Sequence, residues 1–412
     1  MKRRVVVTGM SGLSPLGTGW KAVRESLLAG RSAVQRVDAW DEVDSLRTRL
    51  GAPIDDFVPP ENWPRKKTRS MGKDSLMATR ATELALGDAA LLSHPALTDG
   101  TTGVSYGCTQ GSPRGIEVYA TKFFAGRTTR GIRGNDYIKF MSHTCSANIA
   151  QFFGLIGRLV STCSACTSGS QGIGSGYETI RFGRQDVMVA GGAEELDGID
   201  AAIFDVLYAA STRNDEPTRT PRPYDADRDG TVVAEGAGTL VLEELEYAKQ
   251  RGARIYAEVL GYGTCCDGSH MTNPDPDGME RVMRLALEDA ELAPDDIGYV
   301  NLHGTATEVG DVAESAATYA VFGEAVPVST LKGHMGHTLG ACGALEAWMS
   351  LEMIREGWAA PTLNLDRVGD DCAPLDYIRG ERREIASDCF MSNNFAFGGV
   401  NTSLIFRVTP QD

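Results

Sequence analysis

The chain lacks a long apolar run. No stretch reaches about 18 uninterrupted apolar residues, the length needed to span a bilayer, and Gly9 interrupts the short apolar run at the amino terminus before it could form a signal-peptide core. Basic residues are also scarce: 40 Lys and Arg stand against 55 Asp and Glu, which leaves a net charge of -15. A phosphate backbone would repel such a chain. We therefore expect no membrane span, no nucleic-acid partner and a cytoplasmic location.

Cysteine is present but not in a structural pattern. The nine cysteines contain no pair of CxxC motifs, the spacing typical of four-cysteine zinc sites. A chain of 412 residues is also far longer than the short secreted chains in which cysteines form a disulfide framework. We expect reduced thiols, most of them small buried apolar groups.

Strand-like and helical patterns alternate along the first half, which is typical of an α/β fold. The glycine-rich segment from Gly9 to Gly12 is predicted as a turn that leaves the first strand. Ser11 stands where a GxGxxG motif needs its second glycine, so nicotinamide binding is disfavoured. The predicted strands cover residues 5–8, 159–163, 186–190 and 236–243, and the predicted helices cover 20–29 and 167–182.

A second half follows a charged stretch and repeats the strand and helix alternation. We place the two halves at residues 1–252 and 253–412. The predicted strands of the second half cover residues 254–260, 297–302, 326–331, 390–394 and 403–408, and a helix is predicted over 338–355.

Cys166 differs from the other thiols because it lies between a predicted strand and a glycine-rich helix. At that position a nucleophile gains the helix dipole and exposed backbone N–H groups, so we expect a stabilised thiolate. The glycines of this helix, Gly169, Gly172, Gly174 and Gly176, lower its helix propensity by up to about 1 kcal/mol each. We expect neighbouring backbones to pack very close to them.

Two histidines follow predicted strands in glycine-rich turns, His303 and His337. One thiol and two imidazoles suggest covalent acyl chemistry, because a thiolate accepts acyl groups from thioesters and imidazoles move protons near neutral pH. His270 lies close to the adjacent Cys265 and Cys266, and a metal site is conceivable there. Adjacent cysteines do not supply the usual spaced pair of ligands, so a loop with unused thiols is favoured.

Seven motifs in order carry a family resemblance. They are TGMSGLSPLG, SACTSG, AGGAEE, RPYDADRDG, NLHGTATEVGD, KGHMGHTLGACGALEA and SNNFAFGGVN. Over essentially the whole chain, the sequence resembles the elongating β-ketoacyl-acyl-carrier-protein synthases. The resemblance implies a thiolase-like fold with two similar halves in a five-layer α-β-α-β-α arrangement, and a dimer, either of two copies or with a related ketosynthase-like subunit.

The resemblance also implies the reaction, a decarboxylative Claisen condensation in fatty acid or polyketide biosynthesis. Cys166 would take the acyl group, and His303 and His337 would promote decarboxylation of malonyl carrier protein. No cofactor would be required, because the substrates arrive on the phosphopantetheine of acyl carrier protein. The alternative is a non-catalytic partner subunit that sets chain length, and such partners lack the cysteine.

Further roles follow from the same resemblance. Lys332 and Glu314 match a supporting charged pair, with a structural ion pair as the plainer alternative. The remaining positions form four groups. They are the oxyanion and gate residues Cys166, Phe395, Ala396, Phe397 and Gly398; the pantetheine-binding Thr305 and Thr307; the acyl-pocket residues Cys108, Gln110 and Phe204; and a monovalent cation or water site at Asn301, Glu314, Glu346, Ser392 and Asn393.

Two positions depart from the family pattern. Ala396 replaces the first glycine of a mobile GFGG loop, so either the loop swings less or its resting conformation suits an ordinary residue. Gln110 is polar where an acyl tail is expected, so either the tail is unusual or the amide turns away. With this change the chain also resembles the ketosynthases of aryl polyene pathways.

Two basic clusters could bind the acidic carrier protein or could be ordinary solvated surface. One runs from Arg65 to Lys73, and the other comprises Lys122, Arg127, Arg130 and Arg133 with no acid among them. The docking candidates are Arg65, Lys66, Lys67, Arg69, Arg127 and Arg130.

Overall fold

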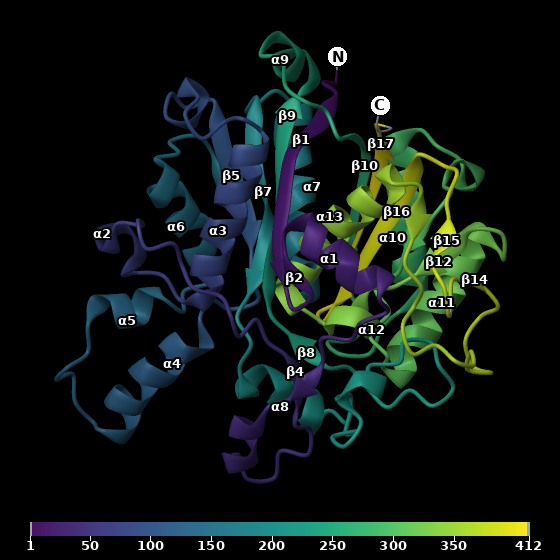
Figure 1. Cartoon of the computed structure of the whole chain (residues 1–412), viewed down its shortest axis with the longest axis horizontal. Helices are drawn as coiled ribbons and strands as arrows, with labels where there is room; N and C mark the ends of the chain where they lie inside the picture. Colours follow the sequence, from purple (N-terminus) through teal and green to yellow (C-terminus); the bar gives the residue numbers. More distant parts are fainter. Residues whose placement is uncertain (1, 410–412) are drawn as a thin grey trace.

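A computed structural model describes residues 2–409, and its centre is one sheet of twelve strands (Figure 1). These strands are β1 (Val5–Ser14), β2 (Gly17–Thr18), β5 (Thr102–Gly107), β6 (Leu159–Thr162), β7 (Val187–Glu194), β9 (Gly236–Glu244), β10 (Ala257–Cys266), β11 (Val300–Asn301), β12 (Pro327–Ser329), β14 (Asp376–Tyr377), β16 (Cys389–Ala396) and β17 (Val400–Val408). Their order is β14-β12-β11-β16-β17-β10-β1-β9-β7-β5-β6, with β2 paired to β1. The antiparallel pairing of β1 with β10 therefore joins the two halves.

The remaining strands form two small sheets. One contains β3 (Gln35–Arg36), β4 (Leu50–Ala52) and β8 (Val233–Ala234), and the other contains β13 (Trp358–Ala359) and β15 (Arg383–Glu384). The helices are α1 (Gly19–Leu28), α2 (Arg65–Thr68), α3 (Lys73–Asp88), α4 (Pro113–Ala120), α5 (Gly134–Ile138), α6 (Thr144–Phe153), α7 (Ser168–Arg181), α8 (Gly198–Val206), α9 (Leu245–Gln250), α10 (Pro276–Ala290), α11 (Glu308–Phe322), α12 (Lys332–Met335) and α13 (Cys342–Arg355).

The helices and strands form five layers. Helix α3 packs on β1, β7 and β9, and α6 packs on β5 and β6. Helix α10 packs on β10 and β17 of the second half, with α11 against α10. Between the two sets of strands lie α7 and α13, which contact each other and strands of both halves (Figure 1). The predicted α-β-α-β-α arrangement is confirmed.

The glycines of α7 are explained by close packing, as predicted. A Cβ on Gly172 would lie 2.4 Å from the carbonyl oxygen of Gly191 in β7. A Cβ on Gly174 would lie 2.2 Å from the ring of Tyr262 in β10. Because the helix touches strand backbone at Gly172 and a strand side chain at Gly174, only glycine lets the middle layer approach the sheet so closely.

The first strand is longer than its sequence indicates. The predicted turn from Gly9 to Gly12 is wrong, since β1 continues to Ser14 and pairs with β9 over that stretch. The register shifts between Val7 and Gly9, where the strand bulges. Each glycine faces a close neighbour instead of opening a turn: a Cβ on Gly9 would lie 2.3 Å from the Ala85 carbonyl oxygen of α3.

Other predicted boundaries move by a few residues. The predicted strand 254–260 begins at Ala257 and runs to Cys266, and the predicted strands 297–302 and 326–331 shorten to β11 and β12. The helix predicted over 338–355 opens with a short 3₁₀ turn, η7 (Leu339–Ala341), before α13. The predicted boundary between the halves falls between α9 and β10. Within residues 2–409, no helix is long and apolar enough to cross a membrane.

Candidate functional site

Cys166 lies in a tight turn between β6 and α7. The turn is the 3₁₀ segment η4 (Ala165–Thr167), and Ala165 has a left-handed backbone with φ of 49°. The Ser168 hydroxyl holds the turn in place, because it accepts a hydrogen bond from Ser164 N at 3.0 Å and donates one to Ala165 O at 2.7 Å. The conformation is one that a non-glycine residue rarely adopts. It places the Cys166 thiol in the interior, where the residue is 7% exposed.

His337 meets this thiol from the second half. Its Nε2 lies 3.0 Å from Cys166 Sγ, and its backbone is fixed to β8 through a hydrogen bond from Ala234 N to His337 O at 2.8 Å. Burial raises the pKa of Cys166 to about 12, although the charge of Lys332 acts to lower it. Burial also lowers the pKa of His337 well below its usual value. A neutral thiol therefore donates to a neutral imidazole, since burial acts against the thiolate that the start of a helix would favour.

Cys163 and Cys166 have the spacing of a CxxC motif, but their side chains have different partners. Cys163 is exposed, and its Sγ donates to Thr109 O at 2.9 Å. All nine cysteines are free. Of these two cysteines, Cys166 is the one whose thiol contacts a histidine.

His303 is oriented by a lysine. Lys332 Nζ lies 3.2 Å from His303 Nδ1, and an ammonium group only donates hydrogen bonds. His303 Nδ1 must then be the acceptor, so the ring proton sits on Nε2. The ring centroids of His303 and His337 are 5.1 Å apart, with planes at 86°. Burial and the Lys332 charge lower the pKa of His303 well below its usual value, which makes it a neutral hydrogen-bond donor.

The partner of Lys332 differs from the predicted one. Lys332 Nζ pairs with Glu346 Oε1 at 2.5 Å, and both side chains are fully buried. Asn394 Nδ2 donates to the other oxygen of Glu346 at 2.8 Å. The predicted pair of Lys332 with Glu314 is therefore wrong. Glu346 sits one helical turn into α13 and reaches the lysine across the layer, which residue spacing alone does not reveal.

Glu314 instead holds the backbone of the His303 turn. Its Oε1 accepts from His303 N at 2.7 Å and its Oε2 accepts from Gly304 N at 2.7 Å. Oε2 also accepts from the Tyr224 hydroxyl at 2.6 Å. All of these groups are buried. A carboxylate with three donors acts as a rigid clamp, so Glu314 positions His303 without touching its ring.

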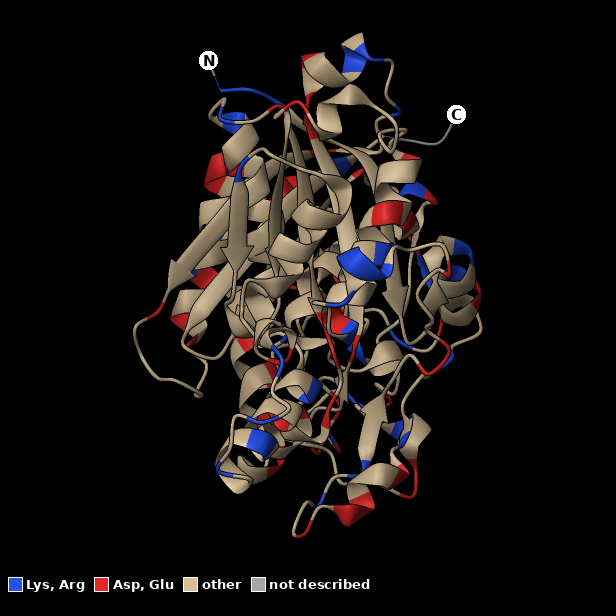
Figure 2. Cartoon of the chain, turned by 90° about the vertical axis from the view of Figure 1, so that its left-hand side faces the viewer, with Lys and Arg blue, Asp and Glu red and all other residues tan. Residues whose placement is uncertain are grey.

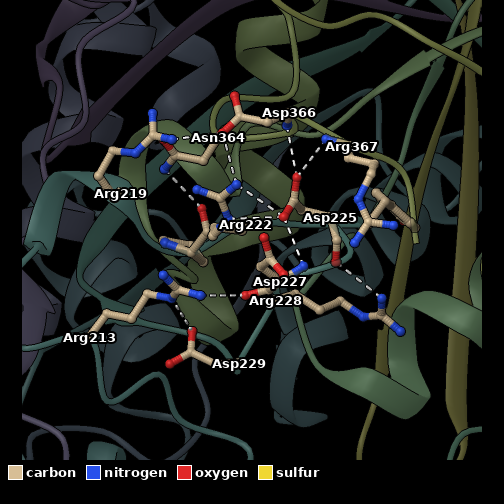
Figure 3. Close-up of polar contacts among 12 residues, drawn as sticks. Arg213, Arg219, Arg222, Asp225, Asp227, Arg228, Asp229, Asn364, Asp366 and Arg367 are labelled. Carbon is tan, nitrogen blue, oxygen red and sulfur yellow. Dashed lines mark hydrogen bonds and ion pairs between the residues drawn. The ribbon is translucent and has the colours of Figure 1, made fainter. Parts of the chain in front are cut away.

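Tyr224 is part of the RPYDADRDG motif, whose arginines and aspartates form a network with residues 364–367 (Figure 3). Arg222 donates to Asp225 and Asp366 at 3.0 and 2.9 Å, and Asp225 Oδ2 accepts from Arg367 N at 2.9 Å. The network anchors the segment that presents Tyr224 to Glu314. Sequence reasoning used this motif only for family resemblance and missed its positioning role.

The residues predicted for a cation or water fall into separate hydrogen-bonding groups. Glu346 is occupied by Lys332 and Asn394, while Glu314 is occupied by the His303 turn. Asn301 Nδ2 donates to Ser392 Oγ at 3.3 Å, and Asn393 Oδ1 accepts from Ser403. Asn301 Oδ1 is buried without a partner, so it is the oxygen of this set that is available to a water or small cation. Because an ammonium group already neutralises Glu346, these residues fit a resident cation poorly.

A cavity of about 530 Å³ opens onto the thiol and both imidazoles. It is lined by the predicted pantetheine-binding Thr305 and Thr307 and by Phe204, Phe395, Ala396 and Phe397. Residues 267 and 270–274 also line it, including His270, a loop that sequence reasoning had set aside. In the sequence, the glycine and the histidine of this loop, next to two cysteines, were the features that could have indicated a place at the site.

Two of the three predicted acyl-pocket residues lie outside this cavity. The Cys108 thiol donates to Ser142 O at 3.5 Å, and Gln110 Nε2 donates to Asp200 Oδ1 at 2.7 Å. Asp200 lies one turn before Phe204 on α8. The ring centroids of Phe204 and Phe397 are 5.5 Å apart, so the two rings pack together. Of the two possibilities for Gln110, the amide is satisfied by a carboxylate and does not face an open tail pocket.

The gate loop explains how alanine can replace glycine at its first position. Ala396 is the last residue of β16 and pairs with Val400, so its backbone is ordinary strand. The left-handed residues come later, with φ of 84° at Gly398 and 70° at Gly399. Gly398 N donates to Met271 O at 2.7 Å. The resting conformation therefore suits an ordinary residue at 396.

The predicted docking residues differ in their surroundings. Arg65, Lys66 and Arg69 are exposed on or beside α2, and so are Arg127 and Arg130 in the segment between α4 and α5. Lys67 is half-buried with its ammonium 5.3 Å from the Phe152 ring centroid. Lys122 pairs with Asp136 at 3.1 Å, so the second cluster does contain an acid in space. Basic and acidic segments are interspersed over this side of the molecule (Figure 2).

A buried cysteine that donates to one neutral histidine, beside a second histidine with its proton on Nε2, defines a cysteine-dependent acyltransferase. The cavity that leads to these groups is lined by Thr305 and Thr307 and by the segment that carries Phe395 and Phe397. Such a site can hold an acyl group on sulfur and stabilise a negative oxygen beside it.

Comparison with known proteins agrees with this class. The family model "Beta-ketoacyl synthase, N-terminal domain" matches residues 2–248, and "Beta-ketoacyl synthase, C-terminal domain" matches residues 256–366. The chain is 37% identical to 3-oxoacyl-[acyl-carrier-protein] synthase 1 of Haemophilus influenzae over 98% of this chain and 99% of that protein. The chain belongs to the β-ketoacyl-[acyl-carrier-protein] synthases, and it is an acyltransferase of their elongating type.

Solved structures give the same answer for the fold. A β-ketoacyl synthase from Burkholderia phymatum STM815 is 56% identical with a TM-score of 0.97, and the match covers 99% of this chain and 100% of that one. A type II polyketide ketosynthase, solved with its acyl-carrier protein and bound to the hexaketide, is 30% identical with a TM-score of 0.89 over the same shares. The predicted thiolase-like fold is confirmed, and the alternative of a non-catalytic chain-length partner is not favoured.

Proposed function

We propose that Cys166 carries the growing acyl group and that His337 accepts its proton during loading. The observation that supports this most directly is the 3.0 Å contact between Cys166 Sγ and His337 Nε2 inside the cavity. Thiol attack on an acyl thioester forms a new carbon–sulfur bond and releases the pantetheine thiol, which takes up the proton. The backbone N–H groups of Cys166 and Phe397 stabilise the oxyanion of the tetrahedral intermediate.

In the second half-reaction, malonyl carrier protein replaces the departing thiol. The Nε2–H of His303, held by Lys332 at Nδ1, donates to the malonyl thioester oxygen. The malonyl carbon–carboxylate bond breaks, CO2 leaves, and the resulting enolate attacks the acyl carbonyl. The bond from that carbonyl to Cys166 then breaks, and the released thiolate takes up a proton from solvent to restore the thiol. Thr305 and Thr307, at the cavity wall, contact the pantetheine arm. The product is a β-ketoacyl thioester that is longer by two carbons.

We propose a specialised acyl chain of the kind that ketosynthases of aryl polyene pathways extend. The support is the hydrogen-bonded polar pair of Gln110 and Asp200, which lies behind Phe204 outside the open cavity, so that a chain extending past Phe204 would meet polar groups. A rigid, unsaturated chain with a polar end would suit this wall better than a flexible saturated one. Substitution of Gln110 by Leu should then improve loading of saturated acyl groups relative to polar ones.

The partners follow from the same proposal. Acyl carrier protein would dock on the exposed basic residues Arg65, Lys66, Arg69, Arg127 and Arg130, which complement an acidic helix. The related polyketide ketosynthase was solved with its acyl-carrier protein. We also propose a dimer, either of two copies or with a related ketosynthase-like subunit, a cytoplasmic location and no required cofactor.

The decisive experiment loads the enzyme from a panel of acyl carrier proteins and measures intact mass. The acyl adduct should form on the wild-type chain and on Cys163→Ser, a matched control for the neighbouring thiol, and should be absent from Cys166→Ala. An adduct that survives in Cys166→Ala, or none from any donor, would overturn the assignment. The panel also ranks saturated, unsaturated and aryl chains, which tests the proposed substrate separately.

A further inference from the structure

A second group of buried thiols lies outside the catalytic site. Asp74 is the second residue of α3, Cys108 follows the last residue of β5, and Cys145 is the second residue of α6. One ligand atom from each of the three lies within 4.8 Å of the other two. The three residues are 0%, 0% and 1% exposed. Residues on or next to three separate elements therefore place two sulfurs and a carboxylate close together in the buried interior.

The contacts within this group leave one carboxylate oxygen without a hydrogen-bond partner and the carboxylate without an ion pair in the part of the chain that the structure describes. Cys145 Sγ donates to Asp74 Oδ2 at 3.1 Å, while Asp74 Oδ1 is buried with no partner. Among residues 2–409, no lysine, arginine or histidine forms an ion pair with Asp74. A fully buried carboxylate with an unused oxygen calls for a cation or a further donor.

We propose that Asp74, Cys108 and Cys145 bind one zinc ion. Zinc lies about 2.3 Å from thiolate sulfur and about 2.0–2.2 Å from carboxylate oxygen, so tetrahedral ligands are separated by about 3.5–3.8 Å. Thiolates favour zinc over magnesium or calcium. Both thiols lose their protons to solvent as the ion binds, and no electron is transferred. Ser75 Oγ, 3.3 Å from Asp74 Oδ2 and 3.7 Å from Cys145 Sγ, offers a fourth ligand or a hydrogen bond to a bound water.

The ion would have a structural role beside the nucleophile. Cys108 O accepts a hydrogen bond from Ser168 Oγ at 3.4 Å, and Ser168 is the residue that holds the turn of Cys166. A zinc ion at Cys108 would therefore tie the starts of α3 and α6 to the wall behind that turn. Because the group is fully buried, the ion would enter as the chain folds.

The test measures metal content of the whole protein, expressed with zinc in the medium and purified under reducing conditions. About one zinc per chain is expected in the wild type and in Cys389→Ser, a buried thiol elsewhere in the sheet. Asp74→Asn, Cys108→Ser and Cys145→Ser should each lose most of it. Cys166→Ala should keep it, which distinguishes this site from the catalytic group of Cys166, His303 and His337, whose ligand atoms also lie within 4.8 Å of one another.

Zinc-edge X-ray absorption of the unmodified protein needs no variant. The proposal expects two sulfur neighbours at about 2.3 Å and light-atom ligands for the rest. A shell containing imidazole would place the ion at the catalytic histidines and overturn the proposal. Zinc-free folded protein, with the thiols simply hydrogen-bonded to Asp74, would also overturn it. Acyl loading is measured separately by intact mass, so failure of this proposal can be told apart from failure of the catalytic one.

Discussion

The contact between Cys166 and His337 makes a prediction about pH. The pKa of Cys166 is about 12 in its buried setting, so at pH 8 only about one thiol in 10⁴ would ionise unaided. The pKa of His337 lies well below its usual value, so its imidazole is neutral over the same range. Loading through His337 as base needs both groups neutral. The wild-type loading rate should therefore be flat between about pH 7 and 9.

Replacing His337 with Ala should change both rate and slope. At pH 7.5 the loading rate should fall by about 10²–10⁴, the usual contribution of a positioned base. The remaining reaction depends on the rare thiolate, so it should rise about tenfold for each pH unit. The assay follows acylation of Cys166 by a small acyl thioester, with intact mass read at successive times and pH values. A small donor excludes effects on carrier-protein docking.

The matched control is His94→Ala, a histidine that does not line the cavity and that should leave the flat profile unchanged. A wild-type rate that climbs tenfold per pH unit would mean that the resting thiolate reacts directly. A His337→Ala variant that keeps the flat profile would show that another group takes the proton. Either result would refute the neutral-pair mechanism.

Three further predictions concern other parts of the molecule. His303→Ala should keep acyl loading but lower malonyl decarboxylation by about 10²–10³, measured as CO2 release; equal loss of both steps would contradict separate roles. Gly172→Ala should lower the free energy of unfolding in urea by about 1–3 kcal/mol, because its Cβ would meet a β7 carbonyl oxygen at 2.4 Å; an unchanged midpoint would show that the layers can separate. Charge reversal at Lys66 and Arg127 should weaken transfer from carrier protein and its salt dependence; a parallel loss with a small thiol reagent would exclude docking as the cause.

The sequence predicted the order of strands and helices well wherever the apolar residues of an element have the regular spacing typical of a strand or a helix. They failed at β1, where Gly9 and Gly12 resemble a turn but are small because α3 and the Trp348 ring of α13 press against the strand. These contacts come from residues far along the chain. They therefore cannot be predicted from the short stretch of sequence around the two glycines.

The candidate site shows the same limit. Cys166, His303 and His337 follow strands, so their convergence at one edge could be anticipated from the fold. The partner of Lys332 could not, since Glu346 and Glu314 both lie on helices near the site and only the three-dimensional arrangement assigns one to the lysine and the other to the His303 turn. The Gln110 contact with Asp200 likewise joins residues that are 90 positions apart.

The middle layer has a consequence for how the chain folds. Helix α7 belongs to the first half but packs on β10 and β17, and α13 belongs to the second half but packs on β1, β7 and β9. At their crossing, a Cβ on Gly343 would lie 2.6 Å from Ser170 N, so the two backbones are in direct contact. Each half therefore completes the hydrophobic core of the other. The two halves share an alternation of strands and helices but form a single cooperative unit in stability, and a chain cut between them should give two fragments that fold only together.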